Sequence, residues 1–193
     1  SDLMNLIEGE TQCLYFGTLC QRNNISRETI QSLFFREIQY FCDLNLRQNY
    51  YSKEIIDIAL KTSNILKINE DELHNINNLF FNGVVKDEKN IAIQLINNYS
   101  IDLICITKGA KGASLYTSDE ESHYQSKVDE IVDTIGAGDA FAAVLCLGFL
   151  KGLSLHKLNK ISNNFAAQIC TIEGAIPMEK IFYNNIIEEF NNG

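Results

Sequence analysis

Short apolar runs alternate with amphipathic segments along most of the chain. A short apolar run predicts a buried strand, whereas apolar residues three and four positions apart predict a helix. This pattern predicts strands at 13–19, 38–43, 64–68, 103–107 and 113–116, with 122–127 suited to antiparallel pairing with the last of these. It predicts helices at 52–61, 90–98, 139–151 and 178–191.

Polar residues mark where several helices begin. Ser26 is predicted to cap a helix, and Ser154 is predicted to cap another. Asn69 is followed three residues later by Glu72, which is the spacing of a capping box. A helix is therefore expected to start just after Asn69.

Strands that alternate with helices indicate an α/β fold with a largely parallel sheet. The sequence has no internal repeat, linker or low-complexity segment, so it is interpreted as one domain. Ligands of such sheets gather beyond the carboxyl ends of the strands, where the polar residues after each strand are expected to meet.

Composition limits the classes of partner and compartment. The 193 residues are 46% hydrophobic, carry a net charge of -9 and include no basic run, so neither nucleic acid nor membrane is an expected partner. No segment has the roughly 18 apolar residues of a membrane span, and the first five residues do not resemble a signal peptide. Six cysteines without a C-x-x-C pair, most of them in apolar runs, are interpreted as buried thiols of a cytoplasmic protein.

The segment 133–139 reads Asp-Thr-Ile-Gly-Ala-Gly-Asp and precedes an apolar helix. Free N–H groups at a helix start attract anions, and glycines let a phosphate approach the backbone closely. A carboxylate in the same turn suits contact with a substrate hydroxyl, so the segment favours phosphoryl transfer to an alcohol. The alternatives are a tight turn capped by Asp139 and a dinucleotide fingerprint, although the latter needs a third glycine where Phe141 stands.

This segment resembles the second signature of the PfkB family of ribokinase-like sugar kinases, D-T-x-G-A-G-D. The resemblance implies a Rossmann-like, three-layer α/β ribokinase fold with a mostly parallel central sheet. It also implies ATP-dependent phosphorylation of a sugar hydroxyl. Asp139 would be the general base and would contact the sugar, while the N–H groups of Gly136, Ala137 and Gly138 would hold the transferring phosphoryl oxygens.

Two further segments resemble motifs of the same family. The segment 43–47 is similar to D-x-N-x-R, which implies ATP binding by Asn45 and a contact of Arg47 with phosphate or a sugar oxygen. The alternative for Arg47 is a surface ion pair with Asp43. The segment 69–72 is similar to N-x-x-E, which implies that Asn69 binds ATP and that Glu72 orders Mg2+, in part through water. Its alternative is an ordinary helix cap.

The segment 107–112 is similar to the T-x-G-x-x-G turn that lies along the nucleotide in the family. The resemblance implies ATP binding by four of its residues, Thr107, Lys108, Gly109 and Gly112; without that context the segment is a hairpin turn.

Two more parts of the site follow from the same resemblance. Asn163 has the spacing to Gly174 that places it beside the adenine. Asp133, Ile135 and the segment 171–174 would surround a monovalent cation such as K+.

The matches run in family order from Leu14 to Ala175, but the family's N-terminal third, with its lid and first strands, has no counterpart. Residues 1–193 are therefore interpreted as the C-terminal two-thirds of one such domain. The sheet edge and apolar surface that this would expose make a partner piece or a homodimer an expectation.

The expected cofactors are ATP, Mg2+ and K+, and the expected ligands are ATP and a small sugar. The motifs look most like those of fructokinases and 2-keto-3-deoxygluconate kinases, which favours fructose or a related ketose or keto-sugar acid over ribose or a nucleoside. Two alternatives have other activities: a nucleotide-binding fragment or pseudokinase without catalysis, and a dehydrogenase.

Overall fold

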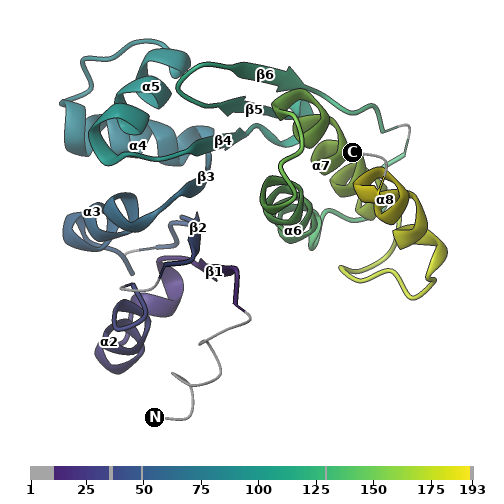
Figure 1. Cartoon of the computed structure of the whole chain (residues 1–193), viewed down its shortest axis with the longest axis horizontal. Helices are drawn as coiled ribbons and strands as arrows, with labels where there is room; N and C mark the ends of the chain where they lie inside the picture. The colour runs from purple at the N-terminus through teal and green to yellow at the C-terminus, as the bar shows by residue number, and fades with distance from the viewer. Residues whose placement is uncertain (1–10, 35–36, 49, 129, 192–193) are drawn as a thin grey trace. The chain divides into compact units, whose positions relative to one another are not determined.

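The computed structural model describes residues 11–34, 37–48, 50–128 and 130–191 (Figure 1). These residues form two compact units. The first contains the described residues up to 106 together with 116–119, and the second contains 107–115 and the described residues from 120 onward.

The first unit is built on strands in chain order, β1-β2-β3-β4, although Thr107 at the end of β4 is grouped in the second unit. Their bounds are Cys13–Phe16, Gln39–Asp43, Ile65–Asn69 and Leu103–Thr107. The β1–β2 and β2–β3 pairs are parallel, as the sequence predicts. The helical elements of this unit are η1 (Leu19–Gln21), α2 (Asn24–Gln31), α3 (Lys53–Thr62), α4 (Glu70–Phe81) and α5 (Glu88–Tyr99).

The core of the first unit lies between alternate strand residues and helices α3, α4 and α5. Every second residue of a strand faces the same side of the sheet. Leu66 and Ile68 of β3 therefore pack in one buried cluster with Ile56 of α3 and Leu95 of α5. Lys67, which lies between Leu66 and Ile68, faces the opposite side of the sheet.

The second unit combines two strands with three helices. Its elements are η2 (Gly109–Lys111), β5 (Ala113–Tyr116), β6 (Glu121–Tyr124), α6 (Ala137–Leu150), α7 (Leu155–Ile169) and α8 (Ile181–Asn191), with Tyr116 grouped in the first unit. The strands β5 and β6 are neighbours, and α6 lies against α7 (Figure 1). Apolar residues of α6, α7 and α8 form a second buried cluster.

Most predicted elements are present, but one predicted helix start and one predicted capping bond differ from the structure. The N-cap of α2 is Asn23, whose side chain accepts from Ile25 N–H at 2.9 Å, so the prediction of Ser26 was wrong. Ser154 does precede α7, yet its side chain makes no capping bond. The capping box of Asn69 and Glu72 is confirmed.

The cysteines are less buried than the sequence predicts. All six are free thiols, but among them only Cys42 and Cys105 are buried, and Cys20 is exposed. Burial raises the pKa of the Cys105 thiol to about 12. In the described part of the chain, no helix has the length and apolar character needed to cross a bilayer.

Candidate active site

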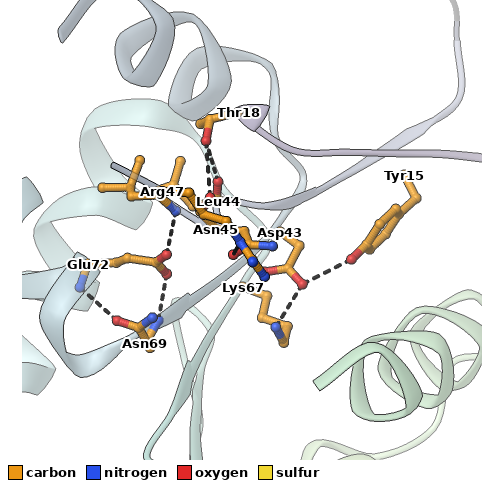
Figure 2. Close-up of polar contacts among 10 residues, drawn as sticks. Tyr15, Thr18, Asp43, Leu44, Asn45, Arg47, Lys67, Asn69 and Glu72 are labelled. Carbon is orange, nitrogen blue, oxygen red and sulfur yellow. Dashed lines mark hydrogen bonds and ion pairs between the residues drawn. The ribbon is translucent and has the colours of Figure 1, made fainter. Parts of the chain in front are cut away.

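The carboxyl ends of β2 and β3 in the first unit carry a buried ion pair (Figure 2). The parallel register sets Asp43 directly opposite Lys67. Lys67 Nζ lies 2.7 Å from Asp43 Oδ2, and the same oxygen accepts from the Tyr15 hydroxyl at 2.9 Å. Asp43 and Lys67 are 7% and 8% exposed. A buried charge is stable only when it is paired, so each of these two residues depends on the other.

The β2 loop (residues 44–48) is fixed from two sides. The hydroxyl of Thr18 donates to the Leu44 carbonyl at 2.7 Å, and the carboxylate of Glu72 accepts from Leu46 N–H at 2.7 Å. Arg47 does not pair with Asp43, which corrects the surface ion pair considered as its alternative. Its Nε instead donates to Asn45 Oδ1 at 3.1 Å, and both side chains are exposed (Figure 2).

Glu72 is a buried carboxylate at the start of α4. Its Oε2 accepts from Asn69 N–H at 2.9 Å, while Asn69 Oδ1 accepts from Glu72 N–H at 2.8 Å. Burial raises the pKa of the Glu72 carboxyl, although these backbone donors oppose the rise. Because both carboxylate oxygens already accept N–H groups, Glu72 fits a role toward Mg2+ at one remove, through water.

In the second unit, the glycine loop (residues 133–138) leads into α6. Gly136 is the N-cap residue and has a φ of 80°, which favours glycine. A Cβ there would lie 2.5 Å from the Cβ of Ala175. Asp139 is exposed in the first turn of α6, where backbone N–H groups have no helical partner. Asp139 is not the cap, so the capped-turn alternative is wrong. The N–H of Ala137 donates to the Thr134 carbonyl at 3.3 Å.

The glycine loop is joined to the turn that follows α7. Asp133 accepts from Ile135 N–H at 3.0 Å and from Gly174 N–H at 3.2 Å. These bonds lower the pKa of Asp133, and the bond from Ile135 N–H has the largest effect. The N–H of Val132 donates to the Cys170 carbonyl at 2.9 Å. The two segments predicted to surround a monovalent cation therefore lie against each other, and their carbonyl groups are of the type that K+ prefers.

The segment 107–112 forms a closed turn around η2. Lys108 N–H donates to the Gly112 carbonyl at 2.8 Å. Gly112 has a φ of 84°, and a Cβ there would meet the Tyr124 carbonyl oxygen. The Lys108 ammonium donates to the buried Ser114 hydroxyl at 2.6 Å. Gly109, with a φ of 55°, faces open space, so it allows close approach of a ligand.

Asn163 points into the protein rather than to the surface. It is 7% exposed, and its Nδ2 donates to the carbonyl and side-chain oxygens of Asn159 at 2.9 and 2.8 Å. The next residue, Asn164, lines a pocket of about 480 Å³. The pocket lies between α7 and the segment 126–132, and Ala167, Gln168 and Thr171 also line it.

The structure brings predicted site residues together in the first unit, whereas no hydrogen bond or ion pair in the described part of the second unit joins Asp139 to the 107–112 turn or to Asn163. Asn45, Arg47, Asn69 and Glu72 are joined through the β2 loop and the α4 cap. Sequence reasoning missed Lys67 as a site residue. The available signal was a lysine inside the otherwise apolar run 65–68.

Comparison with known proteins identifies relatives of this chain. A family model described as pfkB family carbohydrate kinase matches residues 10–181. An ATP-dependent 6-phosphofructokinase of Thermoanaerobacterium thermosaccharolyticum is 26% identical over 185 residues, with 91% of this chain and 55% of the relative aligned.

Solved structures agree with this match. A sugar kinase of Pyrococcus horikoshii in complex with ATP is 30% identical, with a TM-score of 0.72 over 89% of this chain and 55% of that chain. A fructokinase double mutant of Vibrio cholerae O395, bound to fructose, ADP and a potassium ion, has a TM-score of 0.70 at 22% identity over 89% of this chain and 59% of that chain. The predicted three-layer, mostly parallel α/β ribokinase fold is confirmed.

The chain spans about half the length of the curated relatives it matches. The matching family model nevertheless extends over most of the chain's own length. The chain belongs to the pfkB family of carbohydrate kinases.

Proposed function

We propose that this chain is the nucleotide-binding part of an ATP-dependent sugar kinase. The start of α6 carries this proposal, because an exposed carboxylate, Asp139, lies in the first helical turn, whose N–H groups have no partner within the helix and mark its positive end. A site of this kind can hold a phosphoryl group and accept a proton from an alcohol at one place.

In the proposed mechanism, Asp139 accepts the proton of the sugar hydroxyl late in the transfer, as the phosphoryl group moves. A carboxylate is a weak base toward an alcohol, so an early proton transfer would be unfavourable. The N–H groups of Gly136, Ala137 and Gly138 hold the phosphoryl oxygens, for which Ala137 exchanges its 3.3 Å bond to Thr134. Such donors contribute about 3–4 kcal/mol each to the transition state.

Residues of the first unit would neutralise and orient the phosphates. Arg47 offers a planar pair of donors to phosphate or to a sugar oxygen, and Asn69 adds an amide group. Magnesium, when bound with ATP, neutralises phosphate charge, and Glu72 would orient one of its waters. The positive charge of Lys67 lies at the same strand ends, and one of its three N–H groups donates to Asp43.

Residues of the second unit would hold the nucleotide and a monovalent cation. The turn of Thr107, Lys108, Gly109 and Gly112 would lie along the nucleotide. The buried Asn163 would support the part of α7 that lies beside the adenine. The pocket beside Asn164 would hold the adenine base. The carbonyl-rich contact between the glycine loop and the segment 170–174 suits K+, and the Vibrio cholerae fructokinase was crystallised with that ion.

Fructose or a related ketose is the proposed acceptor, since a fructokinase bound to fructose is among the structures that share this fold. The test is ADP release by the full-length protein with ATP and magnesium, offered fructose, 2-keto-3-deoxygluconate, ribose or adenosine. Release with one sugar, lost in Asp139→Ala, is the expected result. ADP binding by this chain without release for any sugar would instead support a non-catalytic nucleotide-binding module.

A further inference from the structure

The β2 loop contains two non-glycine residues with left-handed backbone. Asn45 has a φ of 46° and Gln48 a φ of 50°. Asn adopts this conformation more readily than most residues with a Cβ, whereas Gln rarely does so unless its surroundings impose it. Thr18 and Glu72 supply that constraint, because they bond the backbone at Leu44 and Leu46. The shape of the loop is therefore set by the fold around it.

Within this fixed loop, the Asn45 side chain engages one nitrogen of Arg47. Asn45 Oδ1 accepts from Nε at 3.1 Å (Figure 2). A hydrogen bond between two exposed side chains adds little to folding, so its main effect is on the direction of the guanidinium. The constrained backbone makes that direction reproducible, because the acceptor itself is held in place.

The guanidinium nitrogen that bonds Asn45 determines which edge of Arg47 can still bind a ligand. A guanidinium has five N–H donors, and the bond to Asn45 takes the one on Nε. In the part of the chain that the structure describes, no other group bonds this guanidinium. The two Nη groups therefore form a free edge with parallel donors, the geometry that binds two phosphate oxygens at once.

We propose that Asn45 is a positioning residue that turns the Nη edge of Arg47 toward a phosphate group. The identity of that phosphate as part of the nucleotide rests on the proposed function. The positioning itself does not, since it can be observed in the free chain. A direct contact of Asn45 with the ligand is the competing role.

The first test observes Arg47 directly in the 15N-labelled chain. The Nε–H signal of Arg47, assigned by its loss in Arg47→Met, should show a 1H–15N NOE similar to that of Arg27. Arg27 Nε donates to the Gln21 carbonyl at 2.9 Å and so serves as an internal reference. Asn45→Gly keeps a backbone that tolerates positive φ but removes the acceptor, and it should lower the NOE to that of an unrestrained arginine.

Two variants separate this effect from a change in the loop. Gln48→Gly makes the same change at the other left-handed residue without touching the acceptor, and it should leave the Arg47 signal unchanged. Asn45→Asp keeps an acceptor oxygen and should restore the signal. An unrestrained Arg47 in the wild type, or the same NOE in Asn45→Gly as in the wild type, would overturn the proposal.

The second test measures magnesium-ADP binding by calorimetry. Asn45→Gly should weaken binding by about 2- to 10-fold, the range for one ordinary hydrogen bond, and should have no effect when Arg47 is already methionine. An equal loss in the Arg47→Met background would mean that Asn45 contacts the ligand itself, which contradicts the proposal. If the wild type binds no magnesium-ADP, the nucleotide function fails, while the NOE still decides the positioning.

Discussion

The β2 loop and the glycine loop both present polar groups at the end of a secondary structure element, but they are held differently. Side chains hold the β2 loop: Thr18 and Glu72 bond its backbone, and the buried pair of Asp43 and Lys67 lies where it begins. The glycine loop is held by backbone bonds and by close packing of Gly136 against Ala175, and the Asp133 side chain adds bonds to two N–H groups.

This difference predicts how each loop fails. A loop held by side chains loses stability when one of those side chains is removed. A loop held largely by its backbone tolerates most changes of side chain, Asp133 excepted, but not an added Cβ at the packed glycine. The exposed Asp139, which follows the glycine loop in the first turn of α6, is therefore not needed to hold the loop.

The sharpest separation of activity from stability is expected for Asp139→Asn. Loss of a general base reduces turnover by about 10²- to 10⁴-fold, because the hydroxyl proton then has no acceptor. The exposed side chain contributes little to folding, so thermal unfolding and ADP binding should be almost unchanged. Sugar-dependent ADP release by the full-length protein is the measurement.

Asp71→Asn is the matched control for Asp139→Asn, since Asp71 is an exposed carboxylate in the first turn of α4. It should keep full turnover. Equal turnover in the wild type and in Asp139→Asn would remove Asp139 from the proposed chemistry.

A large loss of stability is expected when the buried pair beside the β2 loop is broken. Among the described residues, Lys67→Met leaves the buried Asp43 carboxylate with the Tyr15 hydroxyl as its one side-chain donor. Removal of one partner from a buried pair costs about 3–5 kcal/mol of the free energy of unfolding. Urea denaturation measures this cost.

Lys61→Met is the control for the buried pair. Lys61 pairs with Asp57 on the surface of α3, and its side chain is 65% exposed. Loss of that pair should change the free energy of unfolding by about 1 kcal/mol at most. Similar effects of the two substitutions would show that the Asp43–Lys67 pair is not desolvated.

The features that sequence predicts best are those encoded over a few neighbouring residues. The spacing of Asn69 and Glu72 alone predicted a capping box that the structure contains. The strand 103–107 was predicted at its exact bounds from its apolar run. The glycine loop pointed to the family because all of its residues lie in one uninterrupted segment.

Features that depend on register or on competition between similar residues were not predictable. Asp43 and Lys67 are 24 positions apart, and only the register of β2 and β3 sets them opposite each other. Asn23 and Ser26 are both good caps, and the sequence does not decide between them. The inward direction of Asn163 depends on how α7 packs through Asn159 against β5 and β6.

Gly136→Ala tests the claim that backbone packing holds the glycine loop. The new Cβ would lie 2.5 Å from the Cβ of Ala175, and φ is 80°. We expect a loss of about 1–3 kcal/mol in urea denaturation, from backbone strain and overpacking. Gly138→Ala is the control, because a Cβ there meets nothing within 4 Å, and its stability should change by about 1 kcal/mol or less. Equal effects would contradict a loop fixed by packing at Gly136.

The smallest effect is expected for Asp133→Asn, and it should depend on pH. Bonds from the Ile135 and Gly174 N–H groups lower the pKa of Asp133 below its ordinary value of 3.8 in the folded chain. A carboxyl with a lowered pKa stabilises the fold above that ordinary value and loses this contribution as the pH falls through its folded pKa. Asp133→Asn should therefore be less stable than the wild type at pH 7, and the difference should shrink below about pH 4.

Urea denaturation between pH 7 and pH 3.5 measures the gap for Asp133→Asn. Glu179→Gln, which removes an exposed charge from the same unit, controls for the general effect of one charge on acid stability. A gap that stays constant with pH would mean that the pKa of Asp133 is the same in the folded and unfolded chain, so that its negative charge does not stabilise the loop. The two ends of the glycine loop would then be held by shape alone, and the charge of Asp133 would be available to a cation.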